Sequence, residues 1–188
     1  MPNQFWCVQT GRLDLRPVAG SDLPDLVAIK SDPRSFALLL GGVRNRQQAT
    51  EELAVDIAFW GQHKVGMWAV RERRGQAFVG VTGIMGRGDG RGMALRFALS
   101  AHCRGRGYAS EAASAALRFA HERAGLARVV AVARGTNMAS REVLAAIGMN
   151  RHEEFMQYGH RMLLYESVVD AVASERRIGI TPPAVAVR

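Results

Sequence analysis

The sequence predicts an α+β fold in which a mixed central β-sheet of about seven strands is flanked by about four helices. Segments with strand and helix periodicity follow the order β-α-α-β-β-β-α-β-α-β-β across residues 10–168. A strand that ends at Leu99, a helix, and a strand that begins at Val129 form a βαβ unit, so these two strands should be parallel and central. The unbroken apolar run at residues 129–133 is typical of a strand buried on both faces.

The expected strands follow from alternation of apolar and polar side chains. Apolar and polar side chains alternate through residues 10–18, which predicts a half-buried strand that ends at Pro17. The clearest alternation runs through residues 93–99. Gly159 separates the last two strands, which predicts an antiparallel pair. The other expected strands are residues 65–72, 77–85, 129–133, 149–158 and 160–167.

Four helices are expected between these strands. The first begins at residues 21–24, with proline in its first turn, and ends near Pro33. The second covers about residues 47–61, with Leu53, Ile57 and Trp60 on its apolar stripe. The third covers residues 107–124 and is followed by Gly125. The fourth covers residues 137–147, with Asn137 as N-cap and Gly148 just past its end.

Composition places the chain among ordinary globular proteins. It has 188 residues, of which 48% are hydrophobic and 22% charged, which excludes disordered and collagen-like classes. No apolar run is long enough to cross a membrane, and the first ten residues lack the features of a secretion signal. Cys7 and Cys103 lie far apart, so neither a disulfide framework nor a zinc site is expected. We therefore expect a cytoplasmic protein without metal, with a domain at residues 9–168 and a tail at 169–188.

The chain is strongly basic, with a formal net charge of +8. All of its 25 basic residues except Lys30 and Lys64 are arginines, which bind phosphate and carboxylate groups in a bidentate manner. An anionic ligand is one interpretation: a phosphorylated cofactor, a nucleic acid or an acidic protein. The arginines are scattered along the sequence, which favours a solvated surface and argues against a nucleic-acid partner.

Two glycine-rich segments invite comparison with phosphate-binding loops. Residues 86–92 lie between two strands with no helix after them, so they predict a hairpin loop with its turn at Asp89 and Gly90. Residues 102–109 instead connect a strand directly to a helix, and they contain Arg104, Gly105, Arg106 and Gly107. Free N–H groups at such a helix start favour an anion, so this second segment predicts a phosphate or pyrophosphate site.

Three known phosphate motifs were compared with residues 102–109. The Walker A loop requires a lysine at the helix entry, and the dinucleotide fingerprint requires a third glycine; both are missing. The pattern Arg-x-x-Gly-x-Ala does fit, with Arg104, Gly107 and Ala109. It resembles the coenzyme A loop of the GNAT superfamily of N-acetyltransferases.

Two further segments and the opening strand extend the resemblance over residues 10–168. Residues 10–17 look like the opening strand of the branch that includes the ribosomal-protein acetyltransferases RimJ and RimL. Residues 107–112 look like its GYAxEA helix entry, and residues 137–149 look like its NxxSxxVLxxxGF segment. Three motifs in the right order, on the expected elements, identify the chain as a member of this RimJ/RimL-like branch.

The resemblance implies a GNAT fold and an acetyl-CoA-dependent N-acetyltransferase that transfers acetyl directly to a primary amine. The pantetheine would lie along the strand ending at Leu99, whose N–H would stabilise the oxyanion of the thioester. Asn137 and Ser140 would face the pantetheine and its sulfur, with Ser140 and the Leu99 N–H as the catalytic groups. The pyrophosphate would bind the loop formed by Arg104, Gly105, Arg106, Gly107, Tyr108 and Ala109.

The sequence departs from the family pattern at three positions. Ala94 stands where the branch often has a glutamate, Leu144 where many members have a tyrosine, and Met149 where a phenylalanine is usual. The first departure leaves the general base open. The second leaves Ser140 as the best hydroxyl for the sulfur side, ahead of two tyrosines elsewhere, Tyr158 and Tyr165.

Several acidic residues have both a structural and a functional interpretation. Glu111 lies in the first turn of its helix, where its charge favours the helix dipole. Glu52 and Asp56 share one helix face, where a cation could dock, although a solvated face is the favoured interpretation. Glu153 and Glu154 are interpreted as an exposed strand end rather than as a base.

The expected acceptor is a peptide or small-molecule amine, and an α-amine rather than a polycation, because clustered carboxylates are few. Two alternatives come from other classes of protein. One is a non-catalytic acyl-CoA-binding module, which the missing glutamate and tyrosine suggest. The other is an RNA- or ribosome-associated basic protein. A homodimer is compatible with the sequence, and no membrane partner is expected.

Overall fold

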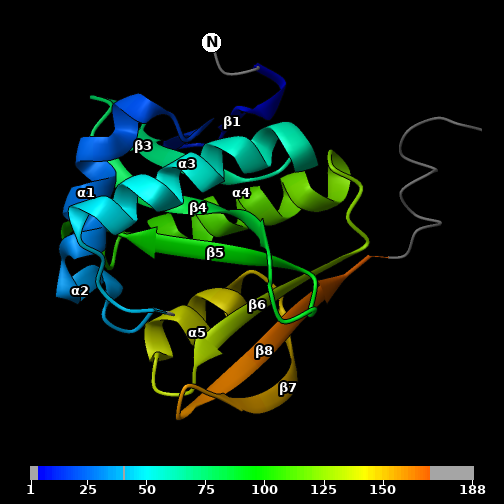
Figure 1. Cartoon of the computed structure of the whole chain (residues 1–188). Coiled ribbons are helices and arrows are strands. Elements are labelled where there is room, and N and C mark those ends of the chain that lie inside the picture. The colour runs from blue at the N-terminus through cyan, green and yellow to red at the C-terminus, as the bar shows by residue number, and fades with distance from the viewer. Residues whose placement is uncertain (1–3, 40, 170–188) are drawn as a thin grey trace, which may run out of the picture.

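The computed structural model describes residues 4–39 and 41–169 and shows a mixed α+β fold. An eight-stranded sheet has the order β1-β2-β3-β4-β5-β6-β8-β7 (Figure 1). Its strands are β1 (Val8–Gln9), β2 (Leu13–Pro17), β3 (Met67–Glu72), β4 (Phe78–Gly86), β5 (Met93–Leu99), β6 (Arg128–Arg134), β7 (Asn150–Gln157) and β8 (His160–Val168). The α-helices are α1 (Leu23–Ser31), α2 (Pro33–Phe36), α3 (Arg46–His63), α4 (Tyr108–Glu122) and α5 (Met138–Ala146).

The parallel contact between β5 and β6 is confined to one place. Ala94 pairs with Val130, and no further register pair joins the two strands. Beyond this point the strands diverge, so the sheet opens into a V between β5 and β6 (Figure 1). All other neighbouring strands pair antiparallel over most of their length. The predicted βαβ unit is therefore confirmed, with α4 as its crossover helix.

Helices cover the sheet on both faces. One core lies beneath α1, α2 and α3, where Leu26, Phe36 and Leu53 pack with Val81 and Ala98 of the sheet. The larger core contains the buried side of α4 together with β6, β8 and Leu144 of α5. Alternation along β5 directs Ala94, Arg96 and Ala98 toward the α1–α3 face and directs Leu95, Phe97 and Leu99 toward α4.

A third, small cluster lies at the vertex of the V. Ala94 and Val130 pack there with Leu164, and Val132 and Phe155 cover them. These residues hold β5, β6 and β8 together at the only place where the two halves of the sheet pair within the described chain. The opening between the strands begins directly beside this cluster.

The expected elements agree with the structure except at a few places. Strand 93–99 is found with the predicted bounds, and Asn137 is the N-cap of α5. The short elements β1 and α2 were not predicted. Ile57 was placed on the buried stripe of the second helix, and this is wrong: its side chain is exposed, whereas Ala49, Leu53 and Trp60 are buried. The stripe runs one residue earlier at this turn, through Asp56.

The glycine-rich segment at residues 86–92 is the predicted hairpin loop. β4 and β5 pair antiparallel on either side of it, and the Arg87 N–H donates to the Gly92 carbonyl at 3.0 Å. Gly90 has a positive φ of 75°, which the turn requires. Among the described residues, no helix is long and apolar enough to cross a membrane.

Candidate functional site

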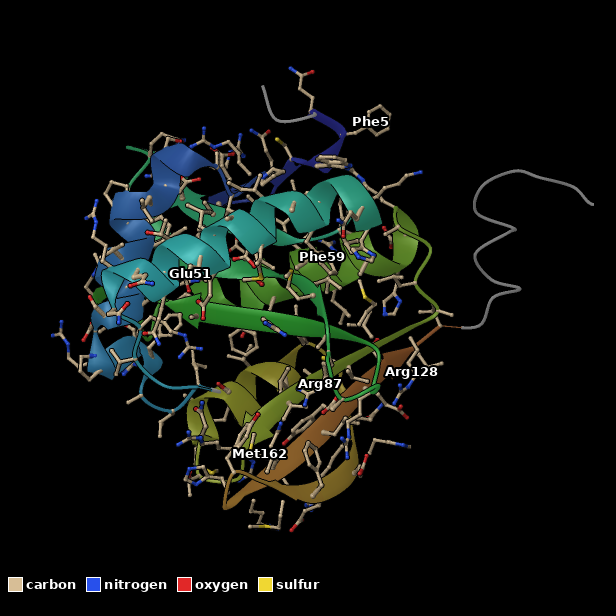
Figure 2. All side chains as sticks on the ribbon, viewed as in Figure 1. Phe5, Glu51, Phe59, Arg87, Arg128 and Met162 are labelled. Carbon is tan, nitrogen blue, oxygen red and sulfur yellow. The ribbon has the colours of Figure 1, made fainter. Side chains whose placement is uncertain are left out.

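A cavity of about 450 Å³ lies in the opening between β5 and β6. Residues 94–98 of β5 form one wall and residues 131–134 of β6 the other. Asn137, Ser140 and Leu144 of α5 close one side. On the other side the cavity extends beneath α1 and α3; Glu51 of α3 and Met162 of β8, which lie on opposite sides of the gap in Figure 2, both line it.

Backbone groups of β5 face this opening. The Ser100 N–H donates to the Val79 carbonyl at 2.9 Å, which places residue 100 in a hydrogen-bonded pair with β4. In an antiparallel ladder such pairs alternate, so the main-chain groups of Phe97 and Leu99 point away from β4 and toward β6. No register pair with β6 uses them. The edge of β5 therefore offers N–H and C=O groups to an extended ligand.

The predicted anion loop lies where β5 passes into α4. Gly105 and Gly107 have φ values of 72° and 74°, a backbone conformation that side chains disfavour. Gly107 is also the N-cap of α4. In the described part of the chain, no backbone or side-chain acceptor is recorded for the N–H groups of residues 105–110. Six consecutive N–H groups without such an acceptor lie at the N-terminal end of α4, where the helix dipole adds to them, and this suits a phosphate or pyrophosphate.

An ion-pair network fixes this loop to the rest of the domain. The Glu111 carboxylate accepts from the hydroxyl of Thr10, and it pairs with the Arg12 guanidinium at 2.6 Å. Burial alone would raise the pKa of Glu111, but the hydrogen bonds from Thr10 and Arg12 outweigh it and lower that pKa. Arg12 also donates to the Arg106 carbonyl at 2.9 Å. Glu111 is therefore a structural anchor, as the sequence indicated, although through these contacts more than through the helix dipole.

The side chains of the loop point in different directions. Tyr108 is buried, and its hydroxyl donates to Glu72 of β3 at 3.0 Å, so only its backbone faces the loop. Arg106 pairs with the same Glu72 at 2.9 Å and lies over the Tyr108 ring. Arg104 is exposed and donates to the backbone carbonyl of Arg34. Residues 104–109 and Leu99 do not line the cavity itself; they lie beyond its β5 end.

The helix α5 presents polar groups to the cavity. Asn137 caps the helix by accepting from the Ser140 N–H at 3.2 Å, and both side chains line the cavity. Leu144 lies one turn further along and is buried in the cavity wall. Of the two other tyrosines considered for the sulfur side, Tyr165 is buried in the larger core and Tyr158 is 82% exposed. Ser140 is thus the hydroxyl that the structure places in the cavity beside α5.

Asp56 is a functional candidate that the sequence interpretation undervalued. With Ala49, Leu53 and Trp60 it forms a stripe at spacings of four, three and four residues, so α3 turns it toward the sheet. It lines the cavity, and no hydrogen bond or ion pair of its carboxylate is found within the described residues. Burial raises the pKa of Asp56 to about 6, and nearby Glu52 adds to this, while Lys30 and Arg96 oppose it.

The expectation of a solvated face for Glu52 and Asp56 is wrong. Both line the cavity between α3 and the sheet. Glu52 is already neutralised there, because it pairs with Lys30 at 2.7 Å and also with Arg44. The two carboxylates therefore differ in kind: Glu52 is a structural ion-pair partner, whereas Asp56 retains its hydrogen-bonding capacity.

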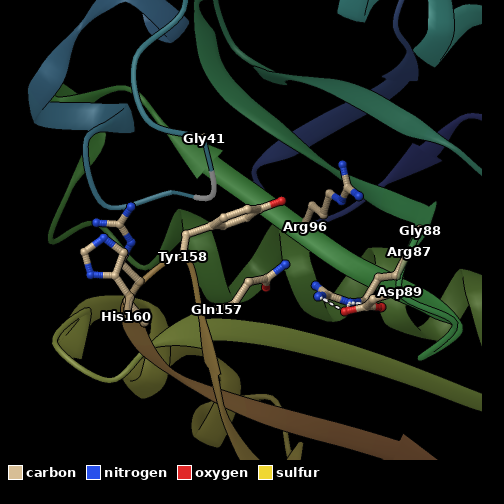
Figure 3. Close-up of a pocket in the computed structure, with 9 residues that line it drawn as sticks. Gly41, Arg87, Gly88, Asp89, Arg96, Gln157, Tyr158 and His160 are labelled. Carbon is tan, nitrogen blue, oxygen red and sulfur yellow. Dashed lines mark hydrogen bonds and ion pairs between the residues drawn. The ribbon is translucent and has the colours of Figure 1, made fainter.

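A second cavity, of about 770 Å³, lies at the mouth of the first. Arg87, Arg96 and Arg134 line both cavities. Figure 3 shows Tyr158 extending across the second cavity toward Arg96, with the Arg87–Asp89 ion pair at one side. Among the described residues, no group of three His, Cys, Asp or Glu side chains is arranged to hold a metal ion.

Comparisons with known proteins identify the kind of domain that the sequence motifs resemble. The sequence profile of the acetyltransferase (GNAT) domain matches residues 12–150. An acetyltransferase from Agrobacterium tumefaciens is 26% identical, with a TM-score of 0.76 over 86% of this chain and 93% of that one. RimL, described as a ribosomal L7/L12 α-N-protein acetyltransferase and solved with coenzyme A, is 18% identical, with a TM-score of 0.72 over 88% of this chain and 99% of that one. A Salmonella typhimurium acetyltransferase that modifies the N-terminal serine of L7/L12 is 17% identical, with a TM-score of 0.73 over 86% and 97%.

The position of Asp56 predicts that its charge destabilises the fold. The folded pKa is about 6 and the ordinary value is 3.8, so the folded state binds more protons between these values. Stability should therefore fall as pH rises from about 4 to 6 on account of this group. Asp56→Asn should raise the free energy of unfolding at pH 8 by about 1–2 kcal/mol, a value reduced for solvent screening, and the gain should vanish near pH 4.

Thermal and chemical denaturation at both pH values measure this difference. Glu142→Gln on the exposed side of α5 is the control and should change stability little. A destabilised Asp56→Asn variant at pH 8 would show instead that Asp56 is a structural ion-pair partner.

Proposed function

The chain belongs to the GNAT acetyltransferase family, and on this basis we propose that it transfers the acetyl group of acetyl-CoA to the nitrogen of a primary amine. One observation carries the proposal. The unpaired edge of β5 is followed along the chain by the loop and helix start whose six N–H groups, at residues 105–110, have no backbone acceptor among the described residues. An extended pantetheine suits the strand edge, and a pyrophosphate suits the helix N-terminus.

The donor half of the site stabilises the thioester as it reacts. Its carbonyl oxygen gains negative charge when the amine attacks, and a fixed backbone N–H of Phe97 or Leu99 would accept that charge in a hydrogen bond. These groups are held by the β4–β5 ladder, so they need no rearrangement during the reaction. The amine nitrogen bonds to the carbonyl carbon, the carbon–sulfur bond breaks, and coenzyme A leaves.

The amine nitrogen loses two protons in this transfer, and the departing thiolate gains one. An α-amine is largely protonated at neutral pH, so its ammonium group gives one proton to solvent before attack, and the nitrogen gives up the second as the amide forms. We assign this second proton to Asp56, because Ala94 leaves no carboxylate on β5 and Asp56 lines the same cavity. Ser140 would donate a hydrogen bond to the departing sulfur from α5, since Leu144 offers no hydroxyl.

The activity is tested by release of the coenzyme A thiol from acetyl-CoA with a panel of amines. We expect turnover with α-amines, as free amino acids or peptide N-termini, at higher rates than with spermidine or a kanamycin-like acceptor at pH 7–8, because few carboxylates lining the cavity are unpaired. Tight coenzyme A binding without release on any amine would identify a non-catalytic binding module. Salt-dependent retention on RNA with no coenzyme A binding would identify the nucleic-acid alternative.

The proposed binding of the pyrophosphate at residues 104–109 predicts the effect of Gly107→Val. The new side chain would meet the Arg12 guanidinium at 3.4 Å and would force φ away from 74°, which moves the N–H groups that hold the phosphates. Coenzyme A affinity, measured by calorimetry, should fall at least about 100-fold. Arg106→Ala should weaken binding only modestly, because its guanidinium already pairs with Glu72.

Gly125→Val is the matched control for backbone strain. Gly125 has a comparable φ of 68° with open space around it, but it lies past the far end of α4. It should retain wild-type affinity for coenzyme A despite a similar loss of stability. Normal affinity in the Gly107 variant would exclude this loop as the phosphate site.

The assignment of Asp56 predicts a pH-dependent rate. Its ionised form accepts the proton, so kcat/KM should decline below about pH 6 in the wild type. Asp56→Asn should lower kcat/KM by about 10²–10⁴-fold and remove this decline. Any pH dependence caused by the pKa of the amine itself should remain in both proteins. An unchanged profile near pH 6 in the variant would place the base elsewhere.

A further inference from the structure

The second cavity is unusually rich in positive charge. Three arginines line it, and among the described residues Asp89 is the one acidic residue in its wall. The carboxylate of Asp89 forms ion pairs with Arg87 and, at 3.1 Å, with Arg91. These arginines bring its pKa far below the ordinary value, so it remains an anion bound to them.

Arg96 and Arg134 remain without a carboxylate partner among the described residues. Arg96 donates only to the Gly86 carbonyl, at a long 3.4 Å. The Nε of Arg134 is buried without a hydrogen-bond partner, and so is the Oε1 of Gln157 in the same wall. Buried polar atoms are normally satisfied, so these unsatisfied groups indicate a site built for a polar ligand.

The two arginines flank the opening of the sheet from opposite sides. Arg96 alternates with Leu95 and Phe97 on β5, and it therefore lies on the α1–α3 face with Ala94 and Ala98. On β6, Val130 and Val132 belong to the vertex cluster while Ala131 and Ala133 face α4, so Arg134 lies on the same face as Arg96. Both arginines line the cavity between β5 and β6 and also the second cavity, which we call the basic cavity.

The internal ion pairs leave a simple pattern of charge. Glu52 is shared by Lys30 and Arg44, and Asp89 is shared by Arg87 and Arg91, so neither carboxylate is available to a further cation. Within the described residues, Asp56 on the α3 side has no ion-pair partner, and Arg96 and Arg134 on the strand side have no carboxylate partner. A ligand that fits this arrangement carries a positive group and a negative group.

We propose that the basic cavity is the subsite for a carboxylate of the acceptor, so that the enzyme acetylates amines that bear a nearby carboxylate. This inference rests on the proposed function and specifies its substrate class. Arg96 and Arg134 hold the carboxylate, and the amine is directed toward Asp56 and the thioester. Guanidinium groups suit this task because they bind carboxylates with two parallel hydrogen bonds.

Paired acceptors that differ in their carboxylates test the proposal, with each rate expressed per concentration of neutral amine. Alanine is compared with alaninamide, and the peptide amide Ser-Asp-Asp-NH2 with Ser-Asn-Asn-NH2, by coenzyme A thiol release at low and high salt. In the wild type we expect kcat/KM to favour the carboxylate member of at least one pair by about tenfold or more, and less at high salt. Preference within the first pair indicates a free amino acid, and within the second an acidic peptide.

Variants of the two arginines should remove this preference. Arg96→Gln and Arg134→Gln should each bring the carboxylate-to-amide ratio close to one, and Arg96→Glu should invert it. Arg118→Gln, an exposed arginine of α4 outside both cavities, is the matched control and should keep the wild-type ratio.

The outcomes separate this inference from the proposed function. Turnover of the neutral and charged members at equal rates would overturn the carboxylate subsite and leave acetyl transfer intact. A preference that persists in both the Arg96 and Arg134 variants would also overturn it. Absence of turnover with every amine would instead contradict the proposed function.

Discussion

The site depends on one constraint, which is that β5 and β6 pair at a single point. The Ala94–Val130 contact and the small cluster around it fix the vertex, and the parallel strands separate on one side of it. The separation leaves main-chain donors and acceptors on β5 that a closed sheet would have used. The cavity, the exposed strand edge and the position of α5 all follow from this geometry. A closed sheet with the same helices would have no room for a ligand here.

The two ends of the cleft are specialised in different ways. Past the end of β5, Gly105 and Gly107 have positive φ values, and Glu111 in the first turn of the following helix anchors that helix to Thr10 and Arg12. Both described carboxylates at this end, Glu72 and Glu111, are paired with arginines and do not compete with an anionic ligand. Toward α3 the cavity instead holds an unshared carboxylate. In the proposed mechanism, the fold thereby separates recognition of a phosphate from acceptance of a proton.

Local signals explain what the sequence predicted well. Some features depend on only a few neighbouring residues, so the sequence predicts them without knowledge of the fold. These are the alternation of residues 93–99, the glycines before α4 and the Asn137 cap. Asp56 was undervalued because its surroundings are assembled by long-range packing of α3 on the sheet. Its stripe with Ala49, Leu53 and Trp60 was the available signal, and the choice of Ile57 obscured it. The basic cavity was also hidden, because Arg96 and Arg134 meet only when the strands carrying them are placed on one face.

Amide hydrogen exchange, measured residue by residue by NMR, tests the central role of the open strand edge most directly. On addition of coenzyme A, exchange at Phe97 or Leu99 and at residues 105–110 should slow markedly. Arg96 and Ala98 provide an internal reference, because alternation along the ladder directs their N–H groups to β4. Slower exchange confined to the first group is the result that this account predicts. Saturating coenzyme A that leaves Phe97, Leu99 and residues 105–110 unchanged would contradict it.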